Sequence, residues 1–361
     1  MRLLSPHAVS SCAQLIHRLR PCTLFLFVSR RRKKETKRTN KERGGRACGR
    51  YMLAATPVPP QARWWMCVRP VVLACMLGTS AYLGCWPEDW YVPIMGAVAA
   101  VIPSSGAPVA GGIVFVPVLQ AHGVAPRDAV AFSALTQLIG CGVLTPLNWL
   151  AAGVFDREAL RASLAPASIG TLASLTVLRV RWCHADHIVA TVFACFCGAL
   201  AVYCFWLLRR TPSPMASQRA VVARIPRPIF AIACAVGGML TGYIGVAIEK
   251  VLFVLLTLEG SCVRRATLTS ITAVGWVSAV AVATHALSSP DPFSPSYIGV
   301  PPVRLWLLAL PGVMIGSMLG PHVHRWLGTT NVLSLFTAYL VAEFLLGIYL
   351  SMTWRGALEC A

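Results

Sequence analysis

Charged side chains are scarce in this sequence. Only 12% of the 361 residues are Asp, Glu, Lys or Arg, whereas 56% are hydrophobic. About a quarter of the residues of a soluble globular protein are charged, so the composition excludes that class and indicates a polytopic membrane protein. The sequence also lacks a P-loop, a nucleophile elbow, a zinc-protease helix and a haem signature. We therefore expect neither an ATP-driven pump nor an enzyme, and no cofactor.

Acidic residues are rare at the N-terminus, where most of the positive charge lies. Residues 1–50 hold 14 Lys or Arg against Glu35 and Glu42, so 12 of the 19 net positive charges lie there. We interpret residues 1–62 as a basic arm. It is either disordered and held at an anionic membrane surface or a targeting segment, and a start at Met52 is a third alternative. Such a tail does not predict nucleic-acid binding.

A metal site is not expected either. Half of the 14 cysteines fall inside apolar segments, where cysteine behaves as a small buried hydrophobe. His322 and His324 have no further ligands at a recognisable spacing.

Apolar runs long enough to cross a bilayer recur along the chain. We expect spanning helices at 70–86, 128–152, 158–180, 187–208, 266–288, 303–322 and 331–352. They divide the chain into an extra transmembrane helix (63–90), a first repeat (91–208), a basic cytoplasmic linker (209–227), a second repeat (228–352) and a tail (353–361). The predicted fold is all-α.

Two longer apolar segments, 91–121 and 228–258, open the two repeats. The first is interrupted by PSSGAPVAGG at 103–112. Each segment is either one broken helix that crosses once or a re-entrant hairpin that returns to the side from which it started. Arginine counting favours the hairpins, because the arginine-rich linker 209–227 then lies in the cytoplasm. Hairpin plus three spans, twice, gives two inverted repeats, the architecture of secondary transporters.

Internal similarity supports the repeat. The stretch GGIVFVPVLQAHGVAPRDAVAFSALT at 111–136 parallels EKVLFVLLTLEGSCVRRATLTSIT at 249–272. Two breaks, one from each repeat, would bring helix N-termini together as an anion cradle. The candidate substrate-binding residues are Ser104, Ser105, Gly106, Gly111, Gly112, Gly242, Gly245 and Lys250. Polar residues that could complete the site are Ser133, Thr136, Gln137, Ser270 and Thr272, although Ser and Thr in membrane helices often bond to their own backbone.

A buried charged pair stands inside the second long segment. Lys250 is the only lysine after Lys41 and directly follows Glu249. Neighbouring residues do not face each other on a regular helix, so we expect no direct ion pair and a separate partner for each. Glu343 is a candidate mate for Lys250 and, with Glu249, a candidate proton-coupling residue. The alternative is that these charges are structural.

The motifs GGIVFVPVL and APRDAVAFSAL, with weaker copies EKVLFVLL and VRRATLTSIT, resemble the sulfite exporter TauE/SafE family, also called the toluene sulfonate uptake permease family. The resemblance covers about residues 91–352. It implies transport of sulfite, sulfonates or related small organic anions. In place of the family's G-x-G-G-G, this chain has PVAGG at 108–112 and VAIEK at 246–250.

Two functions follow as alternatives. The first is a secondary transporter of small anions in the plasma membrane or an organellar membrane. Coupling of this transport to protons is part of the hypothesis. The second is a non-transporting scaffold or assembly factor that retains the fold. They differ in whether Glu249 and Lys250 line a cavity that solvent reaches or are sealed between helices. Besides the anion, the expected partner is the lipid bilayer; the sequence fixes no oligomeric state.

Overall fold

Every regular element is a helix in the part of the chain that the computed structural model describes. This part comprises residues 68–74, 77–78, 91–122, 124, 126–149, 155–178, 186–210, 225–288 and 302–354. The all-α prediction is therefore confirmed. The basic arm, most of the linker and most of the tail lie outside the described residues. Of the extra helix expected at 70–86, only 70–74 and 77–78 are described, and they are helical.

The first half of the chain contains a pair of short helices followed by three longer helical segments. Its elements are α5 (Tyr91–Ser104), α6 (Gly112–Ala121), α7 (Pro126–Ile139), the π-helical turn η2 (Gly140–Leu144), α8 (Thr145–Trp149), α9 (Arg157–Ala173), the π-helical turn η4 (Ser174–Leu178) and α11 (Asp186–Arg210). Helix α7, η2 and α8 run without interruption. Pro146 explains the wide turn between them, because it has no N–H and its ring clashes with the carbonyl one turn earlier.

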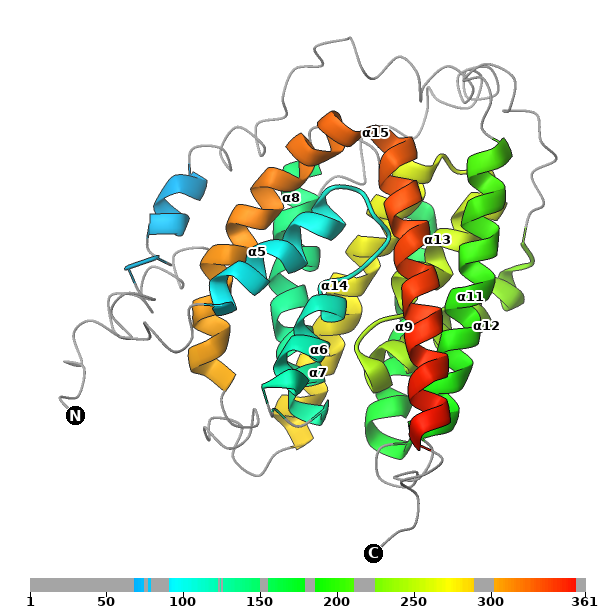
Figure 1. Cartoon of the computed structure of the whole chain (residues 1–361), viewed down its shortest axis with the longest axis horizontal. Helices are drawn as coiled ribbons and strands as arrows, with labels where there is room; N and C mark the ends of the chain where they lie inside the picture. Colours follow the sequence, from blue (N-terminus) through cyan, green and yellow to red (C-terminus); the bar gives the residue numbers. More distant parts are fainter. Residues whose placement is uncertain are drawn as a thin grey trace, which may run out of the picture. The chain divides into compact units, whose positions relative to one another are not determined.

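The second half repeats this order. Its elements are α12 (Arg227–Ile244), α13 (Ile248–Leu258), α14 (Val263–Ser288) and α15 (Pro302–Trp354). Helix α15 is two arms that meet at Gly328, where the backbone has φ 74° and ψ 163°. Figure 1 shows the arms as an orange and a red helix. They match the predicted spans 303–322 and 331–352. Among the described residues, four helical stretches are long and apolar enough to cross a membrane: Asp128–Trp149, Arg227–Ile244, Val263–His285 and Leu305–Tyr349.

Each of the two short helix pairs folds back on itself. Tyr91 begins α5 and His122 follows α6, yet their rings stack with centroids 4.3 Å apart. In the second pair, a Cβ on Gly237 of α12 would lie 3.2 Å from Cβ of Val251 of α13. In a straight helix, Tyr91 and His122 would lie about 46 Å apart, and Gly237 and Val251 about 21 Å apart. Both pairs therefore have hairpin geometry, whereas the inverted relation of the two halves stays a prediction.

The first helix of each hairpin packs against a long helix of the other half. Helix α5 of the first half packs along the first arm of α15, and α12 of the second half packs along α9. Glycines allow both contacts: a Cβ on Gly312 would collide with the carbonyl of Pro93, and one on Gly238 with the carbonyl of Ala167. Small residues let membrane helices approach closely in this way. The hairpin of each half is thus held by a long helix of the other.

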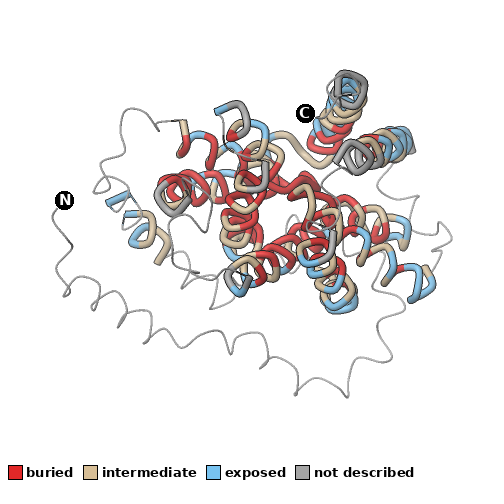
Figure 2. The backbone as a smooth tube through the Cα atoms, turned by 90° about the horizontal axis from the view of Figure 1, so that it is seen from below, coloured by how far each residue is buried: buried red, intermediate tan, exposed pale blue. Residues whose placement is uncertain are grey.

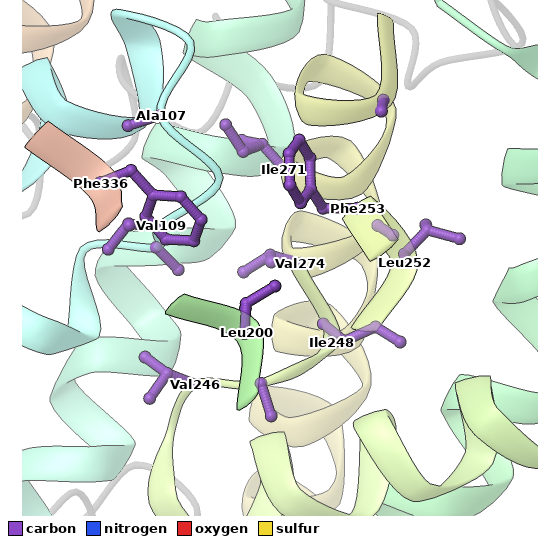
Figure 3. Close-up of a cluster of buried hydrophobic side chains, with 14 of the residues drawn as sticks. Ala107, Val109, Leu200, Val246, Ile248, Leu252, Phe253, Ile271, Val274 and Phe336 are labelled. Atoms are coloured by element: carbon purple, nitrogen blue, oxygen red, sulfur yellow. The ribbon is translucent and has the colours of Figure 1, made fainter. Parts of the chain in front are cut away.

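Both breaks lie inside one hydrophobic cluster. Figure 2 shows that buried residues gather on the inward sides of the helices. In Figure 3, Ala107 and Val109 of the first break and Val246 of the second belong to the same cluster as Leu200 and Phe336. Outward positions carry large exposed apolar side chains, as expected of surfaces that face lipid, for example Ile169, Val202, Ile232, Leu335 and Leu345.

Candidate functional site

The two breaks meet at Gly112, the first residue of α6. A Cβ on this glycine would lie 2.9 Å from Cγ1 of Val246 in the second break. It would also lie 2.7 Å from Nε2 of Gln137 and 2.8 Å from Oγ of Ser133. Any side chain here would overlap its neighbours. Glycine is therefore required for the close approach of the first break to the second.

Gln137 of α7 connects the two halves. Its Nε2 donates to Oγ of Ser133 at 2.7 Å and to the carbonyl of Gly245 at 3.3 Å. Its Oε1 accepts from the hydroxyl of Ser278 on α14 at 3.5 Å. Ser133 and Gln137, named from the sequence as residues that could complete the site, thus lie between the breaks. Thr136, Ser270 and Thr272 instead donate to carbonyls of their own helices, as the sequence analysis expected of Ser and Thr.

The second break is capped by its own side chains. Gly245 ends α12 in the left-handed region, with φ 86°. The hydroxyl of Thr241 accepts from the N–H of Ile248 at 2.8 Å, and Oε2 of Glu249 accepts from the N–H of Ala247 at 3.1 Å. Two backbone donors at the start of α13 are thereby satisfied.

Lys250 is held between two carboxylates. Its Nζ lies 3.4 Å from Oε2 of Glu343 on the second arm of α15 and 3.7 Å from Oε1 of Glu249. The Tyr339 ring lies below the ammonium, with its centroid 5.9 Å from Nζ. The thiol of Cys197 on α11 donates to Oε2 of Glu343 at 3.3 Å. We call Cys197, Glu249, Lys250, Tyr339 and Glu343 the charged cluster.

One expectation about this pair is wrong and one is confirmed. Glu249 and Lys250 do form a direct ion pair, although adjacent residues on a regular helix point apart. The reason is their place in the first turn of α13: the Glu249 side chain turns back to the N–H of Ala247, and the long Lys250 side chain reaches it. The expected separate partner of Lys250 is Glu343, as proposed from the sequence.

The central ion pair of the charged cluster is sealed in this conformation. The side chains of Glu249 and Lys250 have no exposed surface, whereas Glu343 keeps 17% of its side-chain surface exposed and Tyr339 is partly buried. Ion pairs at this depth are costly unless their geometry satisfies both partners. By the criterion set from the sequence, the pair is enclosed between helices and does not line an open cavity.

The tip of the first break is held by other helices. Trp149 Nε1 donates to the carbonyl of Ser104 at 3.0 Å, and His324 Nδ1 lies 2.6 Å from the carbonyl of Ser105. The hydroxyl of Ser104 pairs with that of Thr145 at 2.7 Å. The hydroxyl of Ser105 donates to the carbonyl of Ile102 within its own helix. Both serine hydroxyls are therefore used structurally.

The candidate glycines have different surroundings. Gly106 is in the left-handed region, with φ 87°, beneath the His324 ring. Gly111 lies against Ala99 within the first hairpin and directly precedes Gly112, the first residue of α6. Gly245 lies beside Gln137. Gly242 is apart from this group: a Cβ there would touch Thr171 of α9 and Ser174 of η4, so Gly242 lies in a helix-packing contact.

Several contributors were not singled out from the sequence. Tyr339 and Cys197 complete the charged cluster, and Thr241 caps the second break. Trp149 donates to the first break, and the guanidinium of Arg264 lies 4.5 Å from the centroid of its ring. Tyr339 could have been identified from its spacing to Glu343, because residues four apart lie on the same face of a helix.

The site contains no recognisable metal centre. Among the described residues, no group of three or more His, Cys, Asp or Glu side chains could hold a metal ion. Its chemistry rests instead on two helix N-termini, amide and hydroxyl groups, and the charged cluster.

Comparison with known proteins identifies the chain's relatives. No curated protein and no solved structure matches it. A family model, described as sulfite exporter TauE/SafE, matches residues 92–350. This range includes both hairpins, both breaks and every member of the charged cluster. The chain belongs to the sulfite exporter TauE/SafE family and is therefore a multi-pass integral membrane protein of a transporter family.

Proposed function

We propose that this protein is a secondary transporter of small sulfur-containing anions, such as sulfite or sulfonates, and that it works by alternating access around the two breaks. The observation that carries the proposal is the meeting of the breaks at Gly112 and Val246, beside Gln137 and within the same hydrophobic cluster as α13. A site formed by two short hairpins from two halves can open to one side and then to the other as the halves rock.

Helix N-termini and Lys250 supply the attraction for an anion. The first N–H groups of α6 and α13 have no partner within their helices, and the helix dipole makes these ends positive. Gln137 and Ser133 add neutral donors beside the first of these ends. Such a set suits a small oxyanion, whose charge can be spread over several hydrogen bonds.

Proton coupling is supported by the charge of the cluster. Two carboxylates, Glu249 and Glu343, face one ammonium within 4 Å. Burial makes the ionised form of a carboxylate costly, so a carboxylate in these surroundings can take up a proton and release it again. We propose that this proton is exchanged during transport.

The test is flux in proteoliposomes that contain the full-length protein. Uptake and efflux of labelled sulfite, sulfate and taurine are measured for the wild type and Lys250→Ala, with and without a pH gradient. We expect the wild type to move at least one of these anions, the gradient to drive it, and Lys250→Ala to abolish the flux. If the wild type moves none of them, the transport proposal fails.

A second candidate is a scaffold or assembly factor that keeps the family fold. The complete burial of Glu249 and Lys250 favours it, because an ion pair sealed between helices can serve packing alone. The same flux measurement separates the two. A scaffold predicts that no anion moves and that Lys250→Ala changes only stability.

A further inference from the structure

We propose that the Glu249 carboxylate is an internal competitor of the transported anion: it occupies the N-terminus of α13 beside Lys250, and it must leave as a neutral acid before the anion can bind there. This inference rests on the proposed function and adds the order of events at the same site. It predicts that anion and proton bind together.

The first observation is the position of the carboxylate. Its Oε2 accepts from the backbone N–H of Ala247, and its Oε1 lies 3.7 Å from Nζ of Lys250. A backbone donor at a helix N-terminus and an ammonium are the two groups that would attract a free oxyanion. Glu249 therefore already fills the position in which α13 would hold substrate.

The second observation is how incompletely the carboxylate is bound there. Glu249 has no exposed surface, yet its Oε1 receives no hydrogen bond in the structure. An ionised carboxylate has room for about four hydrogen bonds. A fully buried carboxylate with one bonded oxygen is held less firmly than an oxyanion that could accept from several donors. The site thus points to a ligand that can displace it.

The third observation is the difference between the two breaks. In the aligned motifs PVAGG and VAIEK, Glu249 and Lys250 stand where the first break has Gly111 and Gly112. No side chain can cap α6 from those positions. The competitor therefore belongs to the second break alone, and one carboxylate controls a site that both breaks form.

Charge conservation gives the coupling. The groups that face Glu249 come from three neighbouring elements as well as its own helix: Lys250 of α13, Glu343 and Tyr339 of α15, Cys197 of α11 and Cys141 of η2. If a monovalent anion replaces the Glu249 carboxylate and the carboxylate takes a proton from water, the net charge of this buried region is unchanged. One proton accompanies each anion in the same direction, and each strengthens binding of the other.

The test is anion binding to the purified full-length protein. Methanesulfonate is the probe, because it stays monovalent from acid to alkaline pH. Calorimetric titration is carried out at both ends of that range on the wild type and Glu249→Gln, with Glu158→Gln on the exposed start of α9 as the matched control. We expect wild-type binding to tighten as the pH falls and to take up about one proton per anion. Glu249→Gln should bind about tenfold or more tightly at alkaline pH, without pH dependence, and Glu158→Gln should match the wild type.

The outcomes separate this inference from the proposed function. If the wild type transports and binds anions but Glu249→Gln has the same affinity and pH dependence, the competitor role is wrong and the transporter role stands. If the wild type neither binds nor moves any anion, the proposed function has failed and the inference with it. Should Glu249→Gln not fold, proton uptake by the wild type decides: binding without proton uptake overturns the proposal.

Discussion

Both breaks join the two helices of a hairpin, but they are stabilised in different ways. The first contains Gly111 and Gly112, and the carbonyls of Ser104 and Ser105 at its start are bonded by side chains from distant helices, Trp149 and His324. The second contains Glu249 and Lys250, and it is capped from within by Thr241 and Glu249. A helix break in a membrane must satisfy its backbone groups somewhere. The first break thus relies on tertiary contacts, whereas the second combines local caps with a tertiary hydrogen bond from Gln137 to the carbonyl of Gly245.

Lys250→Met gives the largest expected effect, because it removes the cation that pairs with both Glu249 and Glu343. Loss of one partner from a buried ion pair costs about 3–5 kcal/mol of stability. We expect a large drop in the thermal unfolding midpoint of the purified protein, measured by circular dichroism. The triple variant with Glu249→Gln and Glu343→Gln, in which the cluster is neutral, should recover much of the loss. Equal stability of Lys250→Met and wild type would show that the cluster carries no net ionic interaction.

Gly112→Ala tests the contact between the breaks. The new Cβ would come within 3 Å of Gln137, Ser133 and Val246, and forced overpacking costs about 1–3 kcal/mol. We expect reduced stability. We also expect a loss of anion flux greater than the reduced stability alone would cause, because the breaks must separate during transport. Gly78→Ala is the control, because a Cβ there meets nothing within 4 Å. If both variants transport alike, the close approach at Gly112 is not needed for function.

Trp149→Phe tests the tertiary support of the first break. It keeps an aromatic ring but removes the N–H that bonds the Ser104 carbonyl. A buried carbonyl that loses its donor costs about 1–2 kcal/mol. Trp306→Phe is the matched control, because the indole N–H of Trp306 donates no hydrogen bond in the structure. We expect thermal unfolding to separate the two variants; identical midpoints would contradict the proposed anchoring.

Arg265→Ala should have the smallest effect. Its guanidinium lies 3.1 Å from Asp156, but 47% of the arginine side-chain surface is exposed, and such pairs contribute about 0.2–1 kcal/mol. Asp156→Ala should cost more, because Asp156 also accepts from the N–H of Ala159 at the start of α9. The thermal unfolding midpoints of the two variants, measured at low and high salt, test this order. A larger loss of stability for Arg265→Ala than for Asp156→Ala would contradict the prediction.

Much of the fold could be predicted because it depends on local composition. The long apolar runs gave the helices, and the breaks fall at Ser105–Gly111 and Gly245–Ala247, where Gly and Pro disfavour helix. The site was only partly predictable. Gln137 and Glu343 could be named as polar residues in apolar helices, whereas the structural contacts of Ser104, Ser105 and Gly242 could not be read from the sequence. Their polar character or small size alone did not tell binding from packing.

The sequence by itself determined that this is a membrane-spanning helical protein of the TauE/SafE family, with two broken segments and one buried lysine. These properties follow from the cost of charge in lipid and from backbone preferences, which neighbouring residues set. Only the tertiary structure decided that the breaks fold back as hairpins, that they meet at Gly112, and that Lys250 lies between Glu249 and Glu343. Those contacts join residues far apart in the chain, and they depend on how all the helices pack at once.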